Sequence, residues 1–166
     1  MIDLNGKIIN ITAKTHLANY NEFYEKRWFA SGEGTLDVES LGATMSTECV
    51  LQISDNAVLG VELCEDLWVT EPPSNRLALE GANIIVNLSA SDEYVSKAEY
   101  RRSLVANQSA RCIAAYVYAG ASVYESTTDL VFSGATIIAE NGAIIAEGKR
   151  FQRENVLTIA DVDVEK

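Results

Sequence analysis

Cys64 ends an apolar run and is followed at once by two acids, in the stretch VELCEDLW that covers residues 61 to 68. Acidic side chains are favourable in the first turn of a helix, so this stretch predicts a junction where a strand ends and a helical turn begins. Backbone N–H groups at such a junction point toward the preceding side chain. They can stabilise a thiolate, and they can also donate to an oxyanion. The position therefore predicts a nucleophilic cysteine.

A second interpretation of Cys64 is a small buried apolar side chain, because free cysteines are among the most buried residues in proteins. Cys49 and Cys112 have apolar neighbours and no adjacent acid pair, so we expect both to be of this second kind. Three cysteines without a C-x-x-C pair indicate neither a disulfide framework nor a metal site.

A cysteine nucleophile usually needs a partner that handles protons, and the chain has one histidine, His16. A Cys–His dyad is possible on paper, but no Asn or Asp pattern around His16 marks it as an oriented base. The segment AKTHLANYNEFYEKRWF, residues 13 to 29, is the stronger candidate because it concentrates Lys, Tyr, Glu and aromatic residues. Its alternative interpretation is an amphipathic loop or short helix with solvated charges.

Composition indicates one globular domain of 166 residues with a net charge of -11 and 48% hydrophobic residues. The acidic balance opposes nucleic-acid binding, since the densest basic group is only Lys97, Arg101 and Arg102. No run of about 18 apolar residues and no signal-peptide pattern occur, so we expect a cytoplasmic protein without membrane association. A small-molecule or protein partner fits this composition better.

The elements that must position these residues follow an α/β order. A helix is expected over residues 96–112, with a Ser96–Glu99 capping box and with Leu104, Gln108 and Cys112 on one face. A shorter helix over residues 75–81 is closed by Gly81. Continuous apolar runs predict strands covered on both faces, at residues 56–63, 83–88, 113–119, 135–140 and 156–162.

Two Asn-Gly pairs predict tight hairpins. Asn141-Gly142 joins two apolar runs, so antiparallel strands are expected in the last third of the chain. Asn5-Gly6 is preceded only by MIDL as a partner strand. From this second pair we expect a part of a longer domain whose first strands and helices are missing.

The chain resembles the carbon–nitrogen hydrolase (nitrilase) superfamily, and within it the glutaminase domains of glutamine-dependent NAD synthetases. The family pattern K-[ST]-x-L-x-x-Y-x-E-F-Y-E is met by residues 14–25, and its nucleophile motif by Cys64-Glu65-Asp66-Leu67-Trp68. Further similarity runs through NLSAS, AEYRR, SARCIAAYVY, ESTTDL and ENGAIIAE. The resemblance implies a partial nitrilase-like α-β-β-α sandwich, with residues 1–166 as one partial glutaminase domain.

The resemblance also implies roles for individual residues. Cys64 is implied as the nucleophile that attacks the glutamine side-chain amide and forms a thioester. The Lys14 ammonium and the Glu65 N–H are implied as oxyanion donors, and Glu25 as the carboxylate that orients Lys14. The residues implied to line the glutamine pocket and to read its α-amino and α-carboxylate groups are Tyr20, Glu65, Trp68, Ser91 and Lys97.

The sequence departs from the family pattern in three ways. No residue matches the family's upstream general-base glutamate, and such a base contributes about 10²- to 10⁴-fold, so we expect impaired turnover. Lys97 stands where arginine is common, which removes a bidentate contact. The Ser-Gly-Gly-x-Asp-Ser phosphate loop has no match, so ATP and deamido-NAD are expected to belong to a separate synthetase domain or subunit that accepts the ammonia. No cofactor is expected for the glutaminase step.

Two alternatives stay open beside a glutaminase. One is a general amidase or carbamoylase of the same superfamily, although ESTTDL and the segment of residues 14–25 favour the NAD-synthetase branch. The other is a non-catalytic fragment that serves as an assembly module. A shortened domain would expose apolar surface, so we expect a homo-oligomer.

Overall fold

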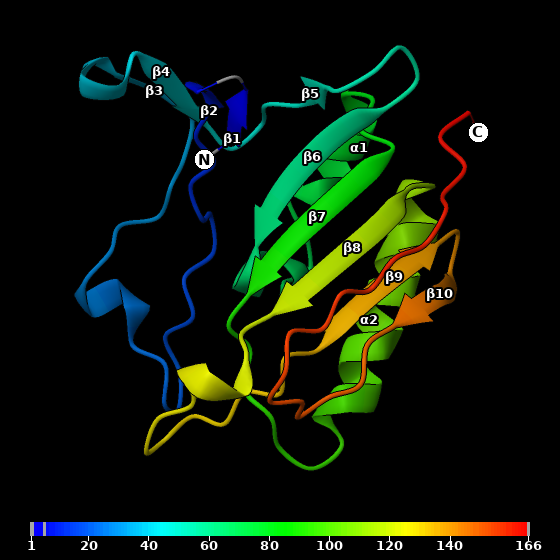
Figure 1. Cartoon of the computed structure of the whole chain (residues 1–166). Helices are drawn as coiled ribbons and strands as arrows, with labels where there is room; N and C mark the ends of the chain where they lie inside the picture. Colours follow the sequence, from blue (N-terminus) through cyan, green and yellow to red (C-terminus); the bar gives the residue numbers. More distant parts are fainter. Residues whose placement is uncertain (1, 5, 166) are drawn as a thin grey trace.

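The computed structural model describes residues 2–4 and 6–165, and its central element is a mixed sheet of six strands in the order β10-β9-β8-β7-β6-β5 (Figure 1). Strands β6, β7 and β8 are parallel, whereas β5, β9 and β10 pair antiparallel to their neighbours. Four of the five predicted strands are thereby confirmed. The strand bounds are β5 Leu51–Gln52, β6 Val58–Leu63, β7 Ile84–Ser89, β8 Ala115–Gly120, β9 Thr136–Glu140 and β10 Ala143–Glu147.

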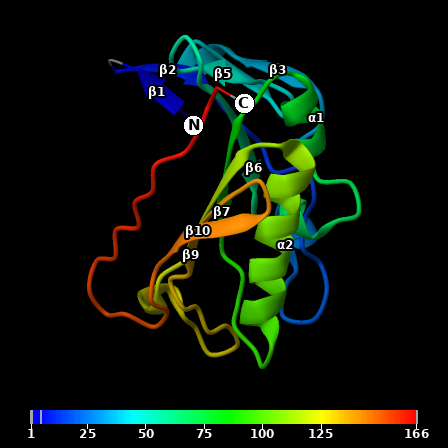
Figure 2. The ribbon, with the colours of Figure 1, turned by 90° about the vertical axis from the view of Figure 1, so that its right-hand side faces the viewer.

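Both α-helices cover the same face of this sheet (Figure 2). Helix α1 (Ser74–Leu79) follows β6 and helix α2 (Lys97–Cys112) follows β7, so each helix belongs to a crossover between parallel strands. The core lies between the helices and the sheet and includes Leu77, Ile85, Val105, Tyr116 and Ile137. Neither helix in the described part of the chain is long and apolar enough to cross a membrane.

The predicted helices are confirmed, with one error at a helix start. Gly81 follows α1 with a φ of +100°, as a residue that closes a helix should. Gln108 donates to Cys112 Sγ on the face of α2 that was expected to be shared. The Ser96–Glu99 capping box is wrong, because the Ser96 side chain makes no capping hydrogen bond. Ser96 has a φ of +72°, whereas a capping residue needs an extended backbone.

Antiparallel strand pairs flank both Asn-Gly positions. Asn141 and Gly142 have φ values of +48° and +89°, the left-handed pair of a two-residue turn between β9 and β10. Strand β1 (Ile2–Leu4) pairs antiparallel with β2 (Lys7–Asn10), while Asn5 itself lies outside the described residues. A further small hairpin, β3 (Thr35–Val38) with β4 (Ala43–Ser46), is not marked by any sequence signal that we used.

The strand predicted at residues 156–162 is wrong. This segment has no regular secondary structure and crosses the sheet face opposite the helices (Figures 1 and 2). Side chains hold it in place: Thr158 Oγ1 lies 2.6 Å from Thr136 Oγ1, and the Asp163 N–H donates to Glu140 Oε1 at 2.7 Å. Because β9 is already paired on both edges, by β8 and β10, no backbone groups of β9 are left for the segment to join.

Candidate active site

Cys64 lies where the sequence predicts it, directly after β6 and at the first position of the 3₁₀ helix η3 (Cys64–Trp68). Leu63 is still extended, but Cys64 has a φ of +49°, so the chain turns sharply at the thiol. A left-handed backbone costs a residue other than glycine roughly 1–2 kcal/mol. Such residues gather at functional sites, and the carboxyl ends of parallel strands are where α/β proteins bind ligands.

The turn presents Cys64 to a cavity of about 900 Å³. Residues from four parts of the sequence border it: the segment 13–29, the β6–η3 junction, the stretch from the end of β7 to the start of α2, and residues 129–132. All eight candidate residues named from the sequence line this one cavity, namely Lys14, Tyr20, Glu25, Cys64, Glu65, Trp68, Ser91 and Lys97. Their convergence is therefore observed, while their individual roles stay predictions.

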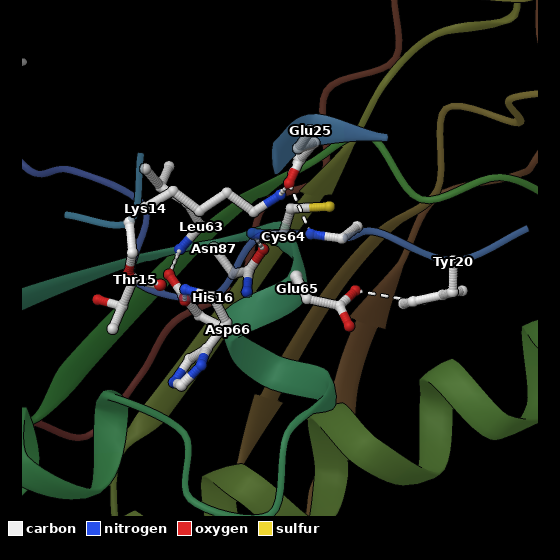
Figure 3. Close-up of polar contacts among 12 residues, drawn as sticks. Lys14, Thr15, His16, Tyr20, Glu25, Leu63, Cys64, Glu65, Asp66 and Asn87 are labelled. Carbon is white, nitrogen blue, oxygen red and sulfur yellow. Dashed lines mark hydrogen bonds and ion pairs between the residues drawn. The ribbon is translucent and has the colours of Figure 1, made fainter. Parts of the chain in front are cut away.

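Lys14 and Glu25 form a close ion pair at the cavity wall. Lys14 Nζ lies 2.6 Å and 2.5 Å from the two carboxylate oxygens of Glu25, which begins the 3₁₀ helix η1 (Glu25–Arg27) (Figure 3). Glu25 Oε2 also accepts the Ala18 N–H at 2.7 Å. The carboxylate is therefore held by the backbone and in turn fixes the ammonium, as orientation of a catalytic group requires.

Glu65 forms a second polar contact at the cavity. Tyr20 Oη donates to Glu65 Oε2 at 2.9 Å (Figure 3). Burial raises the pKa of the Glu65 carboxyl, and the Tyr20 hydrogen bond and the nearby Lys14 charge offset only part of that rise. Burial, followed by the bond to Glu65, also raises the pKa of Tyr20, which keeps its hydroxyl protonated as a donor.

Lys97 is more enclosed than the sequence indicates. Its ammonium forms a buried ion pair with Asp92 and lies 5.2 Å from the Trp68 ring and 4.8 Å from the Tyr94 ring. Trp68 also contacts Tyr100, with ring centroids 5.6 Å apart. Because Asp92 already neutralises Lys97, the lysine offers a ligand an oriented donor more than a free charge. Asp92 was not among the residues predicted from the sequence.

Two more polar residues at the junction were missed. Asp66 Oδ1 accepts the His16 N–H at 2.8 Å and Asp66 Oδ2 accepts the Leu63 N–H at 2.9 Å. Asn87 Oδ1 accepts the Cys64 N–H at 3.1 Å. One signal could have found Asn87, because it interrupts the apolar run of β7. Asp66 was quoted within the nucleophile motif, but only the fold reveals its partners.

His16 takes part through its backbone and not as a base for Cys64. Its side chain borders two smaller cavities, of about 300 and 360 Å³, and is not among the residues that line the Cys64 cavity. Cys49 and Cys112, expected to be buried, are only partly buried. Cys112 nevertheless packs against the core, and burial raises the pKa of its thiol.

The fold and this site define a known class. The family model for carbon-nitrogen hydrolases matches residues 1–166, so the chain belongs to that family and is an enzyme domain of that type. It is 44% identical over 165 residues to the glutamine-dependent NAD(+) synthetase of Mycobacterium tuberculosis, covering 96% of this chain and 24% of that relative. The Aquifex aeolicus protein of the same name is 31% identical over 157 residues, covering 93% of this chain and 24% of the relative.

Solved structures agree with this assignment. A glutamine-dependent NAD(+) synthetase from Cytophaga hutchinsonii superposes with a TM-score of 0.77 at 28% identity, over 93% of this chain and 25% of that chain. An amidase from Nesterenkonia sp. superposes with a TM-score of 0.62 at 18% identity, over 82% of this chain and 44% of that chain, which supports the nitrilase fold alone. The chain spans about a quarter of the length of the curated relatives it matches.

Proposed function

We propose that this chain is a glutamine amidohydrolase module that releases ammonia from glutamine through a cysteine thioester. One observation carries the proposal: Cys64 and the Lys14–Glu25 ion pair border the same cavity, and the thiol there follows a sharp turn at a strand end. A fixed cation beside a thiol suits the attack of sulfur on an amide carbonyl, because negative charge then develops on the carbonyl oxygen.

The proposed reaction has two stages. The Cys64 thiolate adds to the side-chain amide carbon of glutamine, and the oxyanion accepts hydrogen bonds from the Lys14 ammonium and the Glu65 N–H. The carbon–nitrogen bond then breaks, ammonia leaves with an added proton, and a thioester remains on sulfur. Water adds to the thioester and breaks its carbon–sulfur bond, which gives glutamate and restores the thiol.

Proton transfer sets the expected rate. In the family resemblance, the base that takes the thiol proton is an upstream glutamate, and no carboxylate of this sequence has been matched to it. General acid–base steps contribute about 10²- to 10⁴-fold. We therefore propose that residues 1–166 alone bind glutamine but turn it over slowly, because removal of the thiol proton and departure of ammonia both lack that base.

The cavity offers recognition groups for both charged groups on the α-carbon of glutamine. The Glu65 carboxyl, together with Tyr20, suits the α-ammonium group, and the Lys97 ammonium suits the α-carboxylate. Trp68 and Ser91 also line the cavity. Two of these contacts are already made within the protein, since Tyr20 holds Glu65 and Asp92 holds Lys97, so little ordering is needed on binding.

The ammonia acceptor is proposed from the names of the relatives. Several are glutamine-dependent NAD(+) synthetases. We infer that the ammonia made here serves the amidation of deamido-NAD by an ATP-dependent synthetase domain or subunit, in the cytoplasm. ATP and deamido-NAD would bind that partner, and the glutaminase step itself would use no cofactor.

Intact-mass analysis after reaction with a diazo-oxo-norleucine, an electrophile shaped like glutamine, tests the proposal. We expect one adduct that maps to Cys64, is slowed by glutamine and is absent from Cys64→Ala. Ammonia release from glutamine should likewise exceed that of Cys64→Ala. Equal labelling of Cys49 and Cys112 would contradict the proposal and favour the assembly module, whereas faster hydrolysis of a simple aliphatic amide than of glutamine would favour a general amidase.

A further inference from the structure

A chain of three buried polar side chains lies beneath Cys64. The Cys64 N–H donates to Asn87 Oδ1 at 3.1 Å, and Asn87 Nδ2 donates to Tyr116 Oη at 3.1 Å. The Tyr116 hydroxyl then donates to Glu62 Oε1. Asn87, Tyr116 and Glu62 are 1%, 0% and 1% exposed, so the chain is sealed from solvent.

Three neighbouring strands supply these side chains, all on the face covered by the helices. Glu62 comes from β6, Asn87 from β7 and Tyr116 from β8, and Glu62 and Asn87 are register partners across the parallel pair. The same layer holds apolar core side chains such as Ile85 and Val105 and also the buried polar side chain of Gln108, and a buried polar group is costly unless it is hydrogen-bonded. An ordinary core would place aliphatic side chains here, so the polar chain calls for a purpose beyond packing.

The hydrogen bonds in the chain all run in one direction, from the Cys64 N–H to the Glu62 carboxyl. Bonds aligned in this way polarise and strengthen one another. Burial raises the pKa of Tyr116 well above its usual value, which keeps the hydroxyl protonated as the donor to Glu62. The far end is also fixed, because Glu62 Oε2 accepts the N–H of Ser74, the first residue of α1, at 2.8 Å.

The chain ends at a strained residue of the backbone. Cys64 has a φ of +49°, a conformation that persists only when the surroundings impose it. Asn87 binds the N–H of this residue and leaves its thiol to the cavity. The Asn87 contact also occupies the Cys64 N–H, so that amide is not an oxyanion donor, and the task falls to other groups.

We propose that Glu62, Tyr116 and Asn87 form a positioning network that holds the Cys64 backbone in its left-handed conformation and thereby aims the thiol into the cavity. The proposal rests on the proposed role of Cys64 as the nucleophile. None of the three touches the substrate. Each acts through the next, and the last acts through the Cys64 amide.

Tyr116→Phe tests the network, with Tyr118→Phe as its matched control. Both tyrosines lie on β8, on the same face of the sheet and equally buried, but it is Tyr116 that bonds to Asn87 and Glu62, and Tyr118 is not part of this chain. Labelling with the diazo-oxo-norleucine over a range of concentrations separates the maximal rate from the half-saturating concentration. We expect Tyr116→Phe to lower the maximal rate about tenfold at unchanged half-saturation, because misaiming affects the reacting atoms first. Tyr118→Phe should match the unsubstituted chain.

A merely structural role would give another result. Lower stability alone would reduce the folded fraction, which circular dichroism reports. The labelling rate per folded molecule would then be the same in Tyr116→Phe and Tyr118→Phe. Asn87→Ala removes the acceptor of the Cys64 N–H directly and provides a second test if Tyr116→Phe does not fold. Combining the two substitutions should add little to either alone, because both break one chain.

Alkylation by iodoacetamide separates this proposal from the proposed function. Iodoacetamide reacts with a thiol without a glutamine pocket. The measured quantity is the ratio of the alkylation rate at Cys64 to the rate at Cys49 in the same molecule. We expect Tyr116→Phe and Asn87→Ala to lower this ratio. If the unsubstituted chain does not react with the glutamine analogue while this ratio falls in the variants, the proposed glutaminase function is contradicted and the positioning network is supported. If the chain takes the analogue and both variants react like it, the network is overturned and the glutaminase stands.

Discussion

The Asp66 carboxylate binds the backbone N–H of His16, 50 residues away in sequence, at 2.8 Å. Its other oxygen binds the Leu63 N–H at 2.9 Å, and the side chain is only 2% exposed. One buried carboxyl therefore fastens the segment that carries Lys14 to the strand end that carries Cys64 (Figure 3). This clasp, together with the Tyr20–Glu65 hydrogen bond, joins the segment of the lysine to the segment of the thiol at one cavity.

Asp66→Asn should loosen this clasp. The amide keeps one acceptor oxygen and places an NH₂ group against the other N–H, and an unsatisfied buried group costs about 1–3 kcal/mol. We expect the free energy of unfolding in urea to fall by that amount and tryptic cleavage within residues 13–29 to quicken. The control is Asp55→Asn, at an exposed position in a turn. Unchanged proteolysis in Asp66→Asn would show that other contacts hold the segment.

Lys14→Met should slow labelling of Cys64 by the diazo-oxo-norleucine. Methionine keeps much of the side-chain volume but removes the charge, and loss of one oxyanion donor costs about 10²- to 10³-fold. Lys26→Met changes an exposed lysine of the same segment, which does not line the Cys64 cavity, and should leave the rate unchanged. Equal rates in the two variants would remove Lys14 from the mechanism.

Glu62→Gln should change how stability depends on pH. Burial raises the pKa of Glu62 from 4.5, so the folded state holds this proton more tightly than the unfolded state does. The stability from this proton is complete below about 4.5 and is lost as the pH rises through the folded-state pKa. Glutamine cannot ionise, so the free energy of unfolding in urea should decline less with rising pH in the variant than in the unsubstituted chain. The matched control is Glu80→Gln, at the exposed end of α1. Parallel curves for all three proteins would contradict the prediction.

Leu157→Ser combined with Ile159→Ser should weaken self-association. These side chains are 83% and 74% exposed on the segment that crosses the open sheet face, and exposed apolar surface of this kind favours contact with a second copy. Sedimentation velocity over a concentration series should find the unsubstituted chain associating and the variant shifted toward monomer. A stable monomer for the unsubstituted chain would contradict the expected homo-oligomer.

Much of this architecture could be predicted from local patterns. Apolar runs predicted β6, β7, β8 and β9 because β-branched and aromatic residues favour strands, and Asn141-Gly142 marked its hairpin because few other pairs adopt two left-handed residues. The family motifs identified eight of the residues that line the cavity. The strand predicted at residues 156–162 was wrong because their composition suits a strand, whereas pairing requires a free strand edge. The neighbouring strand β9 has none, since β8 and β10 pair with it on both sides.

The partners of the site residues could not be predicted in this way. Asp92 beside Lys97, and Asn87 beneath Cys64, are set by how loops and strands meet in space, and no spacing in the sequence encodes those meetings. Ser96 had the right neighbours for a capping box, but the loop before α2 enters with a left-handed residue. Local chemistry states what a side chain is able to bind, and tertiary structure decides whether a partner is there.

The left-handed backbone at Cys64 makes stability and reactivity compete for one residue. Glycine suits a φ of +49° better than any other residue, yet it carries no thiol. Cys64→Gly should therefore unfold at a higher urea concentration than Cys64→Ala, although both lack the nucleophile. The residue on which the proposed chemistry depends is one that selection for stability alone would replace.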